Sequence, residues 1–97
     1  MTNLQKTKAA QIMAFYGRSN QLDILQEECA ELIQAVSKIR RGTPGAEEHF
    51  IDEFSDVYIM LLEFITDFDD DEKTALYKQI NLKLDRQIDR IEKESDK

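Results

Sequence analysis

The chain has few of the residues that break up or cross-link a fold. Its 97 residues include 1 proline, 3 glycines, no tryptophan and a single cysteine, Cys29. So few turn-forming residues argue against a many-turned β fold and favour a few long helices. Cys29 cannot form an intramolecular disulfide, and it lies among apolar residues. We therefore interpret it as a small core residue of a protein from a reducing compartment, the cytoplasm.

Long apolar runs and excess positive charge are also missing. The longest apolar run, Val57 to Leu62, is too short to cross a bilayer, and Lys6 and Lys8 interrupt any leader-like segment near the N-terminus, so we expect no membrane partner. The net charge of −7 argues against nucleic acid as a partner, because an acidic surface repels phosphate backbones. A nucleotide ligand would need a divalent cation as an adaptor.

Apolar residues recur with the spacing of a helix over most of the chain. The apolar spacing predicts four helices, at about 2–16, 21–41, 43–66 and 69–95. Asn20 and Thr43 are the expected N-caps of the second and third helices, and Asp69 with Glu72 has capping-box spacing at the fourth. The fold class predicted is therefore all-α, in one domain over residues 1–97, with short loops between antiparallel neighbours.

Each of the last three helices has an apolar face. The second helix presents a predicted packing seam, and the third is apolar over so much of its circumference that we expect it to be central. A chain this short is marginally stable alone, which favours an oligomer. The seam of the second helix is Leu22, Leu25, Cys29, Leu32, Val36 and Ile39; the fourth helix carries Tyr77, Ile80, Leu84, Ile88 and Ile91.

Two pairs of acids do not fit a solvated face. Glu28 and Glu31 lie on one side of the second helix beside the seam, and Glu53 and Asp56 repeat the spacing in the most apolar part of the third. No lysine or arginine lies between residues 41 and 73 to pair with them. Antiparallel neighbours would bring the four carboxylates together as a hard-oxygen site, which suits Mg²⁺.

Two other interpretations of these acids were weighed. A Glu pair with this spacing is usually only a solvated face, although two pairs on consecutive amphipathic helices are rarer. A di-iron carboxylate bundle needs Glu-x-x-His pairs, but the only histidine, His49, has Ala46 three residues before it. We interpret His49 as a surface residue at the start of the third helix.

The segments Glu27–Leu32 and Glu53–Val57 resemble the EExxE and ExxD motifs of the all-α nucleoside triphosphate pyrophosphohydrolases, and the short MazG-like type most of all. The resemblance implies a four-helix MazG-like bundle subunit that forms a homodimer or homotetramer. It also implies Mg²⁺-dependent cleavage of a nucleoside triphosphate to the monophosphate and pyrophosphate. Glu28, Glu31, Glu53 and Asp56 would be the metal ligands. Glu27, or Glu28 or Glu31 among the ligands, would activate the water, and Lys83 and Arg86 would contact the substrate.

Two alternatives stay open. The chain could be a catalytically inactive helical interaction or regulatory module of the same fold, which metal-dependent turnover would distinguish. Hydrolysis of phosphoribosyl-ATP is a weaker option, because the basic features expected for that substrate are not evident. The sequence does not indicate the preferred base or sugar.

Overall fold

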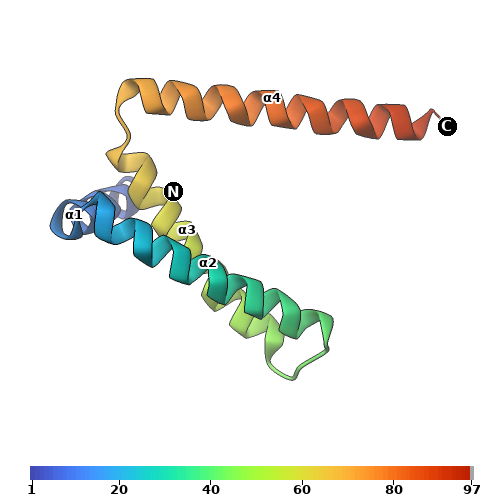
Figure 1. The fold of residues 1–97 in the computed structure, drawn as a ribbon, viewed down its shortest axis with the longest axis horizontal. Helices are drawn as coiled ribbons and strands as arrows, with labels where there is room; N and C mark the ends of the chain where they lie inside the picture. The colour runs from blue at the N-terminus through green and yellow to red at the C-terminus, as the bar shows by residue number, and fades with distance from the viewer. Residues whose placement is uncertain (97) are drawn as a thin grey trace. The chain divides into compact units, whose positions relative to one another are not determined.

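The computed structural model describes residues 1–96, and all regular structure in this range is helical (Figure 1). The helices are α1 (Asn3–Tyr16), α2 (Arg18–Arg40), α3 (Ala46–Asp67) and α4 (Asp70–Ser95). The all-α fold class and the number of helices predicted from the periodicity are confirmed. None of the helices described here combines the length and apolar character that a bilayer span requires.

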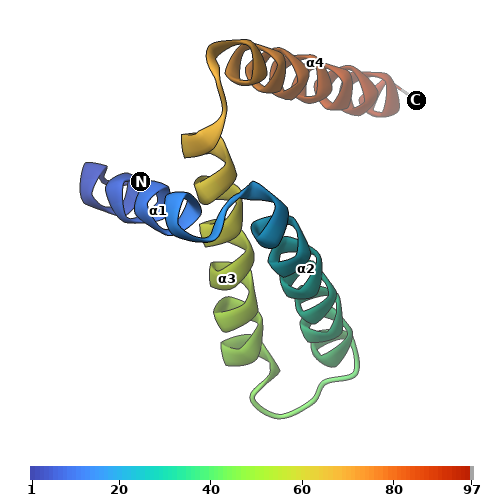
Figure 2. The same cartoon turned by 60° about the vertical axis from the view of Figure 1, so that its left-hand side comes forward.

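The chain divides into two compact units. The first, Met1–Asp67, contains α1, α2 and α3, and the second begins at Phe68 and consists of α4. Within the first unit, α2 and α3 form an antiparallel helical hairpin, and α1 packs mainly against α3 (Figure 2). The antiparallel pairing of the second and third helices follows the prediction from their short connecting loop.

The helix starts differ from the sequence prediction in two places. α2 begins directly after Gly17, at Arg18, so Asn20 lies inside the helix and is not its N-cap. α3 begins at Ala46, not at Thr43 or Pro44. The reason is Gly45, whose positive φ of 77° is incompatible with a right-handed helix and delays the start.

Other helix ends agree with the predicted signals. Gly42 has a positive φ of 69°; its N–H bonds the Ile39 carbonyl at 3.0 Å, and the Thr43 N–H bonds the Lys38 carbonyl at 3.1 Å. These two bonds form a Schellman motif, which satisfies carbonyls at the end of α2. At α4, the Asp69 side chain accepts from the Glu72 N–H, and Glu72 accepts from the Asp69 N–H, which confirms the predicted capping box.

The predicted seam of α2 is buried only in part: Leu25, Cys29 and Leu32 are half-buried, and Leu22, Val36 and Ile39 are exposed. Gln21 and Ala35, beside the seam, are buried. The fully buried Ala35 is small, which suits close packing of the two helices. Most of the core comes from α1 and α3. The buried apolar residues are Ala9, Met13, Ala35, Ala46, Met60, Leu62 and Phe64.

Candidate metal site

The register of the α2–α3 hairpin decides which polar residues face one another. Its anchor is a buried hydrogen bond in which Gln21 Nε2 donates to Glu63 Oε1 at 2.7 Å. Seven residues further along α2, and seven residues back along α3, are Glu28 and Asp56. Seven residues are close to two helical turns, so these acids lie on the same faces as the hydrogen-bonded pair.

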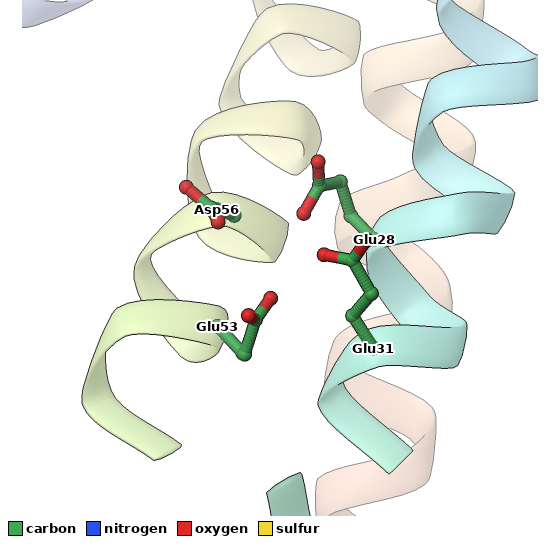
Figure 3. A group of neighbouring side chains, drawn as sticks. All are labelled: Glu28, Glu31, Glu53 and Asp56. Carbon is green, nitrogen blue, oxygen red and sulfur yellow. The ribbon is translucent and has the colours of Figure 1, made fainter. Parts of the chain in front are cut away.

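The structure brings the four acidic residues singled out in the sequence together between α2 and α3. Glu28 and Glu31 from α2 point toward Glu53 and Asp56 from α3 (Figure 3). One carboxylate oxygen from each residue can be chosen so that all four lie within 4.8 Å of one another. This group is called the carboxylate cluster below. Its arrangement offers a divalent cation four oxygen ligands at once.

The four acids of the cluster differ in burial. Glu53 is 8% exposed, Glu28 and Asp56 are half-buried, and Glu31 is exposed. The Oε2 atoms of Glu28 and Glu53 are buried and have no hydrogen-bond partner. A buried carboxylate oxygen without a partner is unfavourable, and within the first unit, Met1–Asp67, no lysine or arginine is paired with the cluster. A bound cation would satisfy both oxygens.

Electrostatics within the cluster favours protonation when no cation is present. Burial raises the pKa of Glu28, and the charges of Asp56, Glu31 and Glu53 raise it further. Burial also raises the pKa of Glu53, as do hydrogen bonding to the Glu31 carboxyl and its charge, while His49 lowers it. A cation in the cluster would compete with these protons for the same oxygens.

His49 lies near the start of α3, as predicted, but it is half-buried and touches the cluster, which was not predicted. Its Nε2 lies 3.2 Å from Oε1 of Glu53, one helical turn along α3. The sequence contained the signal, because residues four apart on a helix are adjacent on its surface. His49 and Glu53 are four residues apart, a spacing that the Glu-x-x-His pattern does not include.

The other predicted site residues lie outside the cluster. Glu27 is exposed on α2. Lys83 and Arg86 are exposed on α4, which belongs to the second unit. The roles of these three residues in water activation and substrate binding stay predictions.

The buried pair Gln21 and Glu63 was missed from the sequence. They are 4% and 2% exposed, so they are among the most buried residues of the chain. Their hydrogen bond fixes the register that aligns the two acidic pairs. The signal was the seven-residue spacing from Gln21 to Glu28 and from Asp56 to Glu63, which places a polar residue on the inner face of each helix.

Comparisons with known proteins add no further information about the site. No family model matches the chain, and neither the curated proteins nor the solved structures contain a match.

Proposed function

We propose that the chain is a magnesium-dependent nucleoside triphosphate pyrophosphohydrolase of the MazG-like type, acting in the cytoplasm. The observation that carries the proposal is the carboxylate cluster, in which four carboxylates converge and two of them have buried oxygens without a partner. A structural role would require basic partners, and none is paired with the cluster within its own unit, Met1–Asp67. The motifs at Glu27–Leu32 and Glu53–Val57 support the assignment to this family.

The donor set favours Mg²⁺ over softer metals. All four members of the cluster offer oxygen, and neither Cys29 nor His49 belongs to it. Hard divalent cations prefer oxygen ligands, whereas zinc and copper favour sites that contain nitrogen or sulfur. The net charge of −7 supports the same choice, since an acidic protein needs a cation to hold a triphosphate.

The different burial of the acids suggests a role for each of them. Glu53 is the most buried acid of the cluster and Glu31 is the most exposed, so a triphosphate would approach over Glu31. When bound, magnesium neutralises phosphate charge and lowers the pKa of a bound water. Glu27 or an acid of the cluster would orient the attacking water, and Lys83 and Arg86 would hold phosphate oxygens.

We also propose that the chain forms a homodimer or homotetramer. The apolar stripe of α4 is exposed at every position from Tyr77 to Ile91, and nothing else in its unit covers it. Phe54, Tyr58 and Leu61 on α3 are also exposed. A lone helix of this kind is marginal in water, so association with another copy would stabilise it.

The test of the activity is pyrophosphate release from a panel of canonical and modified nucleoside triphosphates, with and without Mg²⁺. The proposal predicts Mg²⁺-dependent release with the nucleoside monophosphate as the second product. A folded protein that binds Mg²⁺ but releases pyrophosphate from no member of the panel would favour the inactive interaction module.

A further inference from the structure

His49 is the one residue outside the carboxylate cluster that touches a cluster oxygen in the hydrogen bonds and ion pairs seen for residues 1–96. The contact joins His49 Nε2 to Glu53 Oε1 at 3.2 Å, and both residues lie on the same face of α3. The imidazole side chain is about one third exposed, and the Glu53 side chain is largely buried.

The contact assigns different roles to the two oxygens of Glu53. Nε2 faces Oε1 in an ion-pair contact, and a carboxylate oxygen can accept from an N–H placed there. The other oxygen, Oε2, is buried without a partner. One oxygen is therefore held by the protein, and the other is left for a ligand.

The remaining ring nitrogen supports this arrangement. Nδ1 of His49 is buried and has no hydrogen-bond partner. Among residues 1–96 no hydrogen bond accounts for the orientation of the ring, and its one polar contact there is the ion-pair contact with Glu53. A ring that served only to fill space would not need a buried nitrogen, which is unfavourable without a partner.

We propose that His49 is a positioning residue for the metal site: by holding Oε1 of Glu53 it keeps Oε2 directed toward the cation. The inference rests on the proposed metal site. Residues that bond to metal ligands fix the orientation of those ligands, and their loss typically weakens metal binding by about 10–100-fold.

Two substitutions separate hydrogen bonding from packing. His49→Phe keeps an aromatic ring but removes the donor. His49→Gln keeps an amide N–H at nearly the position of Nε2. Glu48→Gln, at an exposed neighbour on the same helix, is the matched control. For each variant, Mn²⁺ affinity would be measured from the electron paramagnetic resonance signal of free Mn²⁺, and thermal unfolding would be measured without metal.

The inference predicts that His49→Phe weakens Mn²⁺ binding by about tenfold or more. Its melting temperature without metal should not fall, because the substitution removes a buried unpartnered nitrogen. His49→Gln should recover most of the affinity, and Glu48→Gln should match the wild type. Wild-type affinity in His49→Phe would overturn the inference. Equal weakening in both His49 variants with lower melting temperatures would also overturn it, because that result indicates packing alone. Absence of Mn²⁺ binding by the wild type would overturn the metal site itself.

Discussion

At the scale of single residues, Glu53 gives the strongest argument for the proposed metal site. It is buried, lies beside the three other acids of the cluster, and has one oxygen without a partner. Each of these features disfavours the charged folded state when no cation is bound. An acid at this position destabilises the fold unless a ligand is bound, which is typical of a residue retained for function.

Replacing Glu53 by Gln should therefore separate stability from binding. We expect the metal-free variant to be more stable than the wild type, because a buried like charge is removed. Its Mg²⁺ affinity should fall by more than about tenfold, and turnover should be lost. Denaturant titration, calorimetry and pyrophosphate release would measure the three effects. Asp52→Asn, at an exposed neighbour on α3, is the control; a Glu53→Gln variant that retains turnover would contradict the ligand assignment.

The raised pKa values of Glu28 and Glu53 predict an unusual pH dependence. In the folded state both lie above the ordinary value of 4.5. The protonated forms of these two groups stabilise the fold. This stabilisation is therefore fully present below pH 4.5 and is lost as pH rises through the folded pKa values. Without metal, this contribution should be larger near pH 5 than near pH 7, whereas stabilisation by Mg²⁺ should grow as pH rises because protons compete with the metal.

Thermal unfolding between about pH 5 and pH 7 would measure this dependence. The control is the double variant Glu28→Gln with Glu53→Gln, in which both titrating groups are absent. The pH dependence of the metal-free wild type should differ from that of the double variant. The same pH dependence in both proteins would contradict the electrostatic account of the cluster.

At the scale of the elements, the α2–α3 hairpin sets the geometry of the cluster. The Schellman motif at Gly42 closes one end of the hairpin. Toward the other end, Gln21 bonds Glu63, and the Arg18 side chain pairs with Asp67 at 2.9 Å. The Arg18 pair is partly exposed and contributes little to stability. The buried Gln21–Glu63 bond is therefore the contact that most directly fixes the register.

Replacing Gln21 by Ala should destabilise the hairpin by about 1–3 kcal/mol, because the Glu63 carboxyl loses its donor in a buried position. Chemical denaturation would measure the loss. Gln34→Ala, at an exposed position of the same helix, should change stability by less than about 0.5 kcal/mol. Equal stabilities of the two variants would show that the buried bond does not fix the register.

The helix ends show which features of the fold could be predicted from the sequence. Capping at Asp69 and the end of α2 at Gly42 depend on neighbouring residues only, and both were predicted correctly. The starts of α2 and α3 were predicted wrongly because Gly17 and Gly45 override the nearby N-cap candidates Asn20 and Thr43. How far the seam of α2 is buried depends on its partners, so periodicity alone did not show that Leu22, Val36 and Ile39 would stay exposed.

The carboxylate cluster was predictable for a different reason. Two acidic pairs with the same spacing, on helices joined by a short loop, converge in nearly any antiparallel register that also buries apolar residues. The contact of His49 with Glu53 and the Gln21–Glu63 bond depend on side-chain conformations and burial. Those appear only once the helices are packed.

At the scale of the whole molecule, the exposed apolar residues of α4 give the clearest test of self-association. Replacing Leu84, in the middle of the stripe, by Glu should shift the protein toward monomer in light scattering. Leu82 is also exposed but lies outside the stripe, so Leu82→Glu should leave the oligomer intact. A wild-type protein that is monomeric at micromolar concentration would contradict the proposed dimer or tetramer.

The most direct test of the metal site is nuclear magnetic resonance of the wild-type protein with substoichiometric Mn²⁺. Paramagnetic broadening reports where the ion binds along the chain. The account predicts early loss of amide signals around Glu28–Glu31 and Glu53–Asp56, reversed by excess Mg²⁺. Broadening confined to the exposed acids Asp69–Asp71 at the start of α4, or spread evenly over the acidic surface, would contradict a cation site between α2 and α3.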